Sequence, residues 1–128
     1  MSINEIQLIK QNVLTGKAAT AEEIIAAEKS LGLKFAEDYK EYLLTFGNIA
    51  YEGHELTGIC KSKRLNVVDV TKKLRERIGV VPKTLYVIEE TNYDGIVFWQ
   101  NSKGIVYKSL GLSKPKKAYN SLEHFMSI

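Results

Sequence analysis

The spacing of apolar residues in the first half of the chain predicts helices. Thr20 stands three residues before Glu23, as in a capping box, and Gly32 supplies a stop signal after one apolar stripe. We therefore predict a helix between Thr20 and Gly32 that buries Ile24, Ala27 and Leu31. A shorter helix is predicted before it, closed by Gly16, from the apolar residues Ile3, Ile6, Ile9 and Val13.

Two further segments show helical spacing. One runs from about Glu37 to Phe46, with acidic residues near its start, where the helix dipole favours them, and Gly47 after its end. The other follows Asn66, a good N-cap residue, and its spacing outweighs the strand preference of its β-branched residues. Their predicted buried residues are Tyr39, Leu43 and Phe46 in the first, and Val67, Val70, Leu74 and Ile78 in the second.

The second half of the chain is richer in short β-type runs. LYVIEE, IVFWQ and IVYKS are separated by NYDG and NSKG, which predicts consecutive antiparallel strands joined by tight loops. Residues 51–60 predict a loop followed by a strand, and SKPKKAYN a basic surface loop. Ser121 can cap a closing helix that buries Leu122, Phe125 and Met126. Helices grouped outside a run of strands indicate an α+β fold.

Length and composition place these elements in a single domain spanning residues 1–128. The chain is 45% hydrophobic and 26% charged, which is ordinary for a globular protein. Cys60 is the single cysteine and cannot form an internal disulfide, and no secretory leader opens the sequence. No apolar run approaches the roughly 20 residues of a membrane helix. We expect a cytoplasmic protein without membrane contact.

The charge is unevenly distributed along the chain. Residues 1–60 hold five lysines and nine carboxylates, or 5 − 9 = −4, whereas residues 61–128 hold thirteen bases and six acids, or 13 − 6 = +7. Such polarity favours steered association with a charged partner.

Motifs that would carry catalysis are missing from this pattern. His54, His124 and Cys60 do not form a metal-binding signature, and no GxGxxG or P-loop occurs, so we expect no metal, no cofactor and no enzyme. His54 beside Glu55 is a possible acid/base pair, but neighbours on a strand point to opposite faces. Cys60 lacks a recognisable base and is interpreted as structural.

Two kinds of charged surface remain. The basic runs KSKR, KKLRER and KPKK suit phosphates, with Tyr86, Trp99 and Tyr107 as stacking candidates, but an amphipathic helix needs a polar face anyway and strand aromatics usually pack in cores. Nucleic-acid binding is therefore the less favoured interpretation. The acidic residues suit a basic partner or a solvated rim; they are Glu52, Glu55, Glu89, Glu90 and Asp94.

The order of several segments resembles the SUKH superfamily, particularly its small bacterial YobK-type branch. These segments are AEEIIAAEKSLGLKFAEDYKEYLLTFGN, GHELTGI, LNVVDVTKKLRE, LYVIEETNYDGIVFWQ, GIVYKS and SLEHF, and they cover residues 19–126. The sequence departs from the family pattern at Ala36, where a proline is usual before the third helix.

The resemblance implies an α+β fold with flanking helices and a role as an immunity protein that occludes a cognate polymorphic toxin, possibly a nuclease. The alternatives are a regulatory SUKH domain with no toxin partner, a small RNA-binding domain, and a hydrolase that uses His54. By analogy with the family, acidic side chains would complement a basic toxin and aromatic ones would anchor it. Trp99 follows the apolar run IVF, which also fits a core position. The partner-binding residues so implied are Tyr51, Glu52, His54, Glu55, Tyr93, Asp94 and Trp99.

Overall fold

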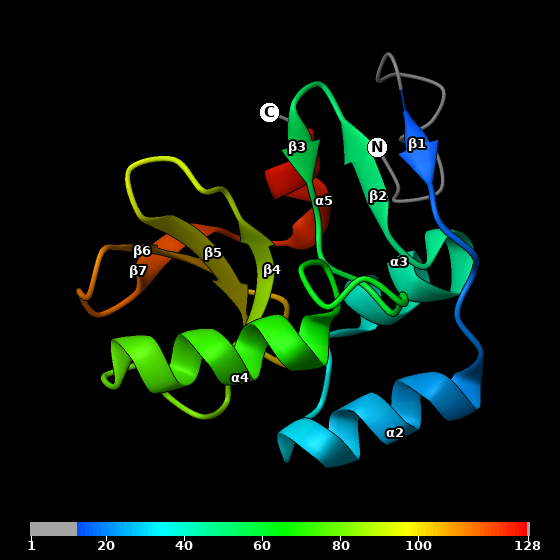
Figure 1. The fold of residues 1–128 in the computed structure, drawn as a ribbon, viewed down its shortest axis with the longest axis horizontal. Coiled ribbons are helices and arrows are strands. Elements are labelled where there is room, and N and C mark those ends of the chain that lie inside the picture. Colours follow the sequence, from blue (N-terminus) through cyan, green and yellow to red (C-terminus); the bar gives the residue numbers. More distant parts are fainter. Residues whose placement is uncertain (1–12, 128) are drawn as a thin grey trace.

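The computed structural model describes residues 13–127, which form two antiparallel sheets and four helices (Figure 1). The smaller sheet has the order β1-β2-β3, and the larger has the order β4-β5-β6-β7. The strands are β1 (Leu14–Thr15), β2 (Ile49–Tyr51), β3 (His54–Glu55), β4 (Tyr86–Glu90), β5 (Ile96–Gln100), β6 (Val106–Leu110) and β7 (Lys116–Tyr119). The helices are α2 (Ala21–Leu31), α3 (Glu37–Phe46), α4 (Val67–Ile78) and α5 (Leu122–Met126). The predicted α+β class is confirmed.

Local signals in the sequence account for the helix boundaries. Thr20 and Glu23 form the predicted capping box at α2, and Gly32 ends this helix in the left-handed conformation, with φ of 68°. The Asn66 side chain accepts hydrogen bonds from two backbone N–H groups at the start of α4. Ser121 caps α5 in the same way. The predicted apolar stripes of these helices, and of α3, are buried.

Three sequence interpretations need correction or fall outside the structure. The strand predicted in residues 51–60 begins earlier, because Ile49–Tyr51 pairs with His54–Glu55 in a hairpin. The basic loop SKPKKAYN contains β7, which completes the larger sheet by pairing with β6. The predicted first helix falls mostly on residues outside the described range, and at its end Leu14–Thr15 is a strand.

The larger sheet separates two hydrophobic clusters. On one face, α4 packs with Leu74 and Ile78 against Val87, Val97 and Trp99. On the other face, residues of α2, α3 and α5 pack against side chains that include Tyr86, Ile88 and Val106. Because β4 contributes to both clusters, it is the central structural link between the helices.

Thr57, a buried threonine shortly after β3, joins the two sheets because it bonds to β4. Thr57 donates its backbone N–H to the carbonyl of Ile88 (2.9 Å) and its hydroxyl to the carbonyl of Val87 (2.8 Å). The Tyr39 hydroxyl lies 2.8 Å from Thr57 Oγ1, and the Tyr42 hydroxyl donates to the Thr57 carbonyl (2.6 Å). These bonds hold the β2–β3 hairpin against both α3 and β4.

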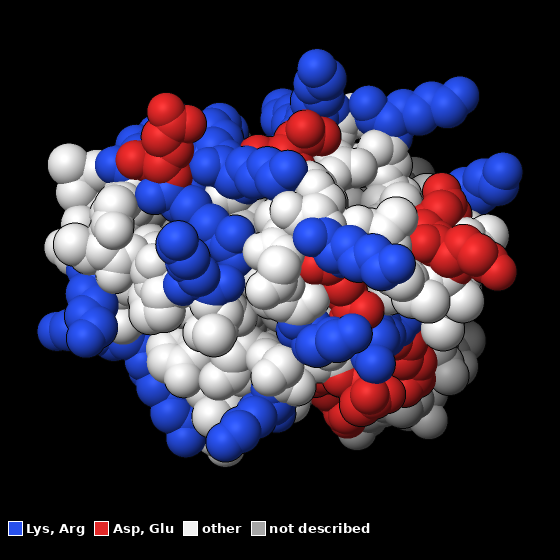
Figure 2. Space-filling model, turned by 90° about the horizontal axis from the view of Figure 1, so that it is seen from below, with Lys and Arg blue, Asp and Glu red and all other residues white. Residues whose placement is uncertain are grey.

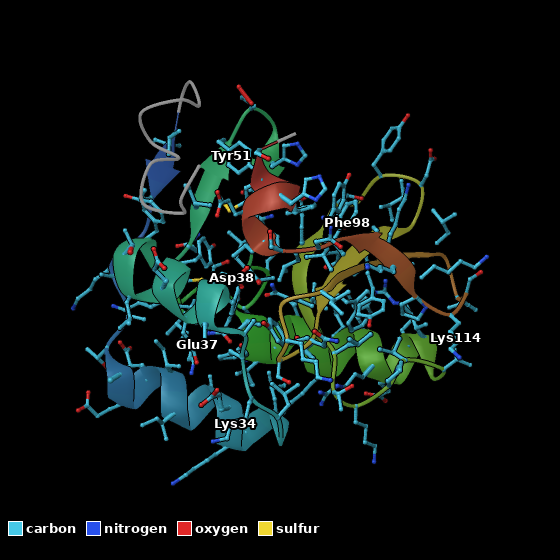
Figure 3. The ribbon with its side chains drawn as sticks, turned by 180° about the vertical axis from the view of Figure 1, so that it is seen from behind. Lys34, Glu37, Asp38, Tyr51, Phe98 and Lys114 are labelled. Carbon is cyan, nitrogen blue, oxygen red and sulfur yellow. The ribbon has the colours of Figure 1, made fainter. Side chains whose placement is uncertain are left out.

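A second polar junction ties α3 to the larger sheet and to α5 (Figure 3). Asp38 accepts hydrogen bonds from the Gln100 side chain (3.0 Å) and from the backbone N–H of Leu122 (2.9 Å). The Ala36 N–H donates to the Tyr86 hydroxyl (3.0 Å). A proline at position 36 would lack this N–H, so the departure from the usual family residue gives the chain a hydrogen bond.

None of the helices within residues 13–127 is both long and apolar enough to cross a membrane.

Candidate functional site

The β2–β3 hairpin presents its turn at one end of the molecule, beside α5 (Figure 1). Tyr51 pairs with His54, so Glu52 and Gly53 form a two-residue turn, and both have positive φ, of 46° and 85°. Positive φ is what tight two-residue hairpin turns require, although a non-glycine residue such as Glu52 adopts it with difficulty. The turn therefore holds Glu52 at an exposed and conformationally restricted position.

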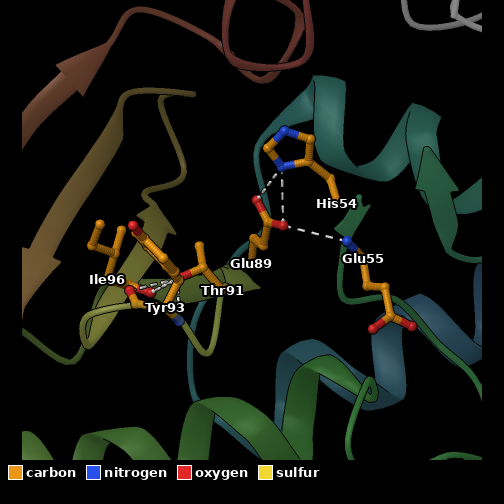
Figure 4. Close-up of polar contacts among 6 residues, drawn as sticks. All are labelled: His54, Glu55, Glu89, Thr91, Tyr93 and Ile96. Atoms are coloured by element: carbon orange, nitrogen blue, oxygen red, sulfur yellow. Dashed lines mark hydrogen bonds and ion pairs between the residues drawn. The ribbon is translucent and has the colours of Figure 1, made fainter. Parts of the chain in front are cut away.

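A buried carboxylate supports this hairpin from β4 (Figure 4). The Glu89 side chain is only 4% exposed, and its two oxygens lie 3.1 Å and 3.2 Å from His54 Nδ1. Glu89 Oε2 also accepts the backbone N–H of Glu55 (3.3 Å). A single carboxylate thus fixes both the ring of His54 and the backbone of β3.

The Glu89 carboxylate changes the ionisation behaviour of its surroundings. Burial raises the pKa of Glu89, while His54 and the Glu55 N–H partly offset that rise. Burial also raises the pKa of Tyr51, and the negative charges of Glu89 and Glu52 add to the effect. Tyr51 therefore stays neutral throughout the physiological range.

The β4–β5 loop projects on the same side of the molecule as the hairpin turn (Figures 1 and 3). The Thr91 hydroxyl donates to the carbonyl of Ile96 (2.7 Å) and accepts the N–H of Tyr93 (3.2 Å), which closes the loop from within (Figure 4). Asn92 and Asp94 both have positive φ, of 55° and 53°. Tyr93 stands between them with 69% of its surface exposed.

Backbone strain is concentrated in these two loops. Within residues 13–127, the non-glycine residues with positive φ are Glu52, Asn92 and Asp94, and all three belong to these loops. Such conformations typically cost of order 1 kcal/mol or more each and persist where the surrounding structure imposes them. We name the exposed side chains of the two loops and of β3 the loop surface: Glu52, His54, Glu55, Tyr93 and Asp94.

Two residues predicted to bind a partner are buried in the core instead. Trp99 is fully buried, and its Nε1 donates to Ser109 Oγ (2.9 Å). Tyr51 is buried in the cluster around α3. Neither side chain is therefore exposed on the loop surface, and for Trp99 the preceding apolar run had already indicated a core position.

The acidic residues named from the sequence do not form one exposed group. Glu89 is buried, and Glu90 lies beside Lys73 (2.9 Å) and Arg77 (3.8 Å) of α4. Glu55 forms a two-bond contact with Arg64, at 2.9 Å and 3.0 Å, which lowers the pKa of its carboxyl. Sequence reasoning missed the roles of Glu89 and Arg64, because both depend on contacts between residues 9 to 35 positions apart.

The cations of the basic helix α4 make hydrogen bonds and ion pairs within the molecule. Arg75 donates to the carbonyls of Leu31 and Lys83, and Lys72 donates to Ser30 Oγ (2.9 Å). Figure 2 shows that Lys and Arg predominate on the α4 side of this face, whereas most Asp and Glu lie on the α2 side. Tyr86 and Trp99, the proposed stacking residues, are fully buried. These placements weaken the nucleic-acid interpretation.

The side chains considered for catalysis, His54, Glu55 and Cys60, each make structural contacts. Within residues 13–127, no cluster of three or more potential metal ligands occurs, and Glu89 is the only side chain hydrogen-bonded to the His54 ring. As predicted for neighbours on a strand, the Glu55 carboxylate turns away from His54, toward Arg64. Burial raises the pKa of Cys60, which disfavours a reactive thiolate.

Fold and site together define a small α+β domain that joins two antiparallel sheets and presents a shaped loop surface. A family model described as SUKH_5, SMI1-KNR4 cell-wall, matches residues 1–127, so the chain belongs to this family. A crystal structure of a protein from Pseudomonas syringae pv. tomato has the same fold, with a TM-score of 0.78 and 18% identity over 98% of this chain and 92% of that one. Comparison with curated proteins finds no match.

Proposed function

We propose that this protein is a cytoplasmic immunity protein that binds a cognate protein toxin through the loop surface and blocks it by occlusion. Membership in the SUKH family supports a domain of this general type. The observation that carries the proposal is Tyr93, a largely exposed tyrosine held between two left-handed residues. Tyrosine has only two rotatable side-chain bonds, and the backbone of Tyr93 is already fixed by Thr91, so little entropy is lost on binding, which suits an interface anchor.

Charge on the loop surface supports a basic partner. Glu52 and Asp94 are exposed on the two turns, and Glu55 adds a carboxylate on β3 that Arg64 partly neutralises. A toxin that acts on nucleic acid commonly carries basic residues around its active site, so acidic side chains would speed its association. Tyr51 and Trp99 contribute indirectly, because they are buried in β2 and β5, the strands that flank the two loops.

The first test identifies the partner. The tagged protein is expressed in its native host, recovered at moderate salt, and analysed by mass spectrometry for co-purifying proteins. We expect a stoichiometric complex with the C-terminal domain of a secreted protein. Recovery of RNA, or of no partner, would remove the immunity proposal, and a stable partner unrelated to any toxin would favour a regulatory SUKH domain.

Variants then test the loop surface in that complex. Tyr93→Ala should weaken binding by at least about tenfold, the effect expected of an interface anchor, without changing the unfolding midpoint. Ile25→Ala is the matched control, because Ile25 is also an exposed apolar residue but lies on α2. Equal binding by both variants would place the interface elsewhere.

A further inference from the structure

The second surface that stands out in this molecule is the segment of residues 101–119, which contains β6 and β7 and which we name the lysine hairpin. Between Asp94 and Glu123 the sequence contains no acidic residue. The same stretch contains five lysines, and all of them are exposed: Lys103, Lys108, Lys114, Lys116 and Lys117.

The charges of the lysine hairpin are not balanced inside the described molecule. Among residues 13–127, none of its lysines forms an ion pair, in contrast to Lys73 and Arg77 of α4. Lys108 and Lys116 are direct cross-strand partners. Like charges in that position repel each other and destabilise the pairing of β6 with β7. An external anion would relieve this repulsion.

An apolar groove lies at the end of the same hairpin. Its volume is about 270 Å³, and its apolar walls come from Leu74 and Ile78 of α4, from Val97 and from Leu112. Leu112 is 68% exposed at the edge of this groove. The volume is below the range typical of small-molecule sites, so it suits a single large side chain.

Two glycines allow the chain to form this groove. The N–H of Gly111 donates to the carbonyl of Gly95 (3.0 Å), and a Cβ on Gly95 would lie 3.1 Å from Gly111. Both glycines also have positive φ. This close approach brings the β4–β5 loop beside the β6–β7 turn. Figure 3 shows Lys114 on that turn, near the C-terminal end of α4.

The net charge around the groove is also positive. Arg77 and Glu90 both line the groove. The Glu90 carboxylate lies 2.9 Å from Lys73 Nζ and 3.8 Å from Arg77 Nη1. Two cations therefore share one carboxylate at this edge, and the exposed Lys114 adds a third positive charge nearby. The apolar groove is thus flanked by Arg77, which shares its carboxylate with Lys73, and by Lys114, which forms no ion pair with the described residues.

We propose that the lysine hairpin and this groove form a second interaction surface, which binds an acidic protein segment carrying one large apolar side chain. The apolar side chain occupies the groove, and the flanking carboxylates meet Lys114 and Arg77. This proposal rests on different observations from those that support the toxin-binding loop surface, and it does not require a toxin.

The exposed leucines favour a protein over a nucleic acid. Leu110 is 52% exposed beside Lys108, and aliphatic side chains offer nothing to a phosphate backbone, whereas single strands usually stack on exposed aromatic rings. In the lysine hairpin, Tyr107 is half-buried, and Tyr119 packs against Phe98 and Phe125. The available aromatic surface is therefore small.

The test is an NMR titration of the full ¹⁵N-labelled chain with defined probes. The first probe is a blocked eight-residue peptide with one leucine between glutamates. The second replaces its leucine by alanine, the third replaces its glutamates by glutamine, and the fourth is an eight-nucleotide oligo-dT. We expect the first peptide to shift amide signals of residues 108–117 and of Leu74 and Ile78. Each altered peptide should bind more weakly.

Variants establish whether the named residues bind the peptide. Lys114→Glu should weaken binding at least about tenfold, and Leu112→Ser should reduce it without changing the charge. Lys29→Glu is the matched control, because Lys29 is also exposed and lies in the last turn of α2. Unfolding curves confirm that each variant is folded.

Three results would overturn the proposal: no shifts at millimolar peptide, shifts that are unaffected by the lysine and leucine variants, or tighter binding of oligo-dT at the same residues. Tyr93→Ala separates the two proposals. We expect this variant to lose toxin binding while it retains peptide binding, so either surface can fail without the other.

Discussion

The loop surface and the lysine hairpin meet at the same end of the larger sheet, where the β4–β5 loop lies beside the β6–β7 turn, but their charges are balanced differently. Around the loop surface, carboxylates have internal partners: Glu89 meets His54, and Glu55 meets Arg64. In the lysine hairpin, no described carboxylate balances the five lysines. Charges with internal partners stabilise a local conformation, whereas unbalanced charges remain available to a partner. The first surface is therefore defined by its shape and the second by its electrostatic potential.

The largest effect should come from removing the common support of both surfaces. Trp99→Ala empties a fully buried site in β5 and should cost about 3 to 5 kcal/mol of unfolding free energy. Chemical denaturation followed by circular dichroism measures this cost. Tyr93→Ala is the comparison, since an exposed side chain should change stability little. An unchanged unfolding free energy in Trp99→Ala would mean that the cluster around β5 does not support both surfaces.

A smaller loss of stability should follow from weakening the connection between the loop surface and β4. Thr57→Val keeps the shape of the side chain but removes the hydroxyl that contacts Tyr39 and Val87. Leaving the buried Tyr39 hydroxyl without this partner should cost about 1 to 3 kcal/mol. Thr57→Ser keeps the hydroxyl and should recover most of the loss. Hydrogen exchange should show faster opening of the β2–β3 hairpin in the valine variant. If the hairpin exchanged no faster, it would be held by other contacts.

The dependence of stability on pH should distinguish the two surfaces further. Because the pKa of Glu89 is raised in the folded state, the folded protein binds a proton more readily than the unfolded chain does. The contribution of Glu89 to stability is therefore greatest in acid and falls as pH rises from the unfolded pKa through the raised folded value. Glu89→Gln cannot titrate, and it keeps an acceptor for the Glu55 N–H.

We expect Glu89→Gln to gain stability relative to the native protein as pH increases from about 4 toward neutrality, starting from the ordinary carboxyl pKa. Thermal unfolding across this range measures the difference. Groups that face Glu89 are His54, Tyr51 and Glu55, so a His54→Gln control separates the imidazole contribution. Parallel pH profiles for Glu89→Gln and the native chain would contradict the assignment.

The smallest expected effect concerns the lysine hairpin. Lys108→Glu places a carboxylate directly opposite Lys116 and replaces repulsion by attraction. Stability should rise by about 0.2 to 1 kcal/mol at low salt, and the gain should shrink as added salt screens the charges. Lys103→Glu is the control, because Lys103 lies in a turn outside the cross-strand pairs. A loss of stability in Lys108→Glu would show that Lys108 and Lys116 do not repel each other.

Much of the fold followed from local sequence patterns. The capping box at Thr20, the N-cap at Asn66 and the turn residues between β4, β5 and β6 each act through neighbours a few positions away. The strand β7 was missed because its KKAY segment carries little apolar pattern, and it pairs only because β6 offers an unpaired edge. The sequence left open whether Trp99 is buried, since an apolar run does not indicate which face of the strand is covered by other residues.

The candidate site depended more strongly on tertiary structure. Regular alternation would place Ile88 and Glu89 on opposite faces of β4, but a register shift between Val87 and Glu89 interrupts the pairing with β5. The shift pairs Glu89 with Phe98, which packs on the same cluster as Ile88, so Glu89 lies on the face that meets His54, 35 residues earlier in the chain. A bulge of this kind has no distinctive local sequence, so the carboxylate that supports the hairpin was interpreted only as part of an acidic rim.

The sequence by itself determined the helices, the three consecutive strands and the excess of lysine between Asp94 and Glu123, because each depends on composition or on residues close in the chain. Tertiary structure alone decided that Glu89 is buried beside His54, that the cations of α4 are mostly engaged within the molecule, and that the lysine hairpin is not. The physical reason is that an ion pair depends on distance in space, which chain order does not specify across 9 to 35 residues.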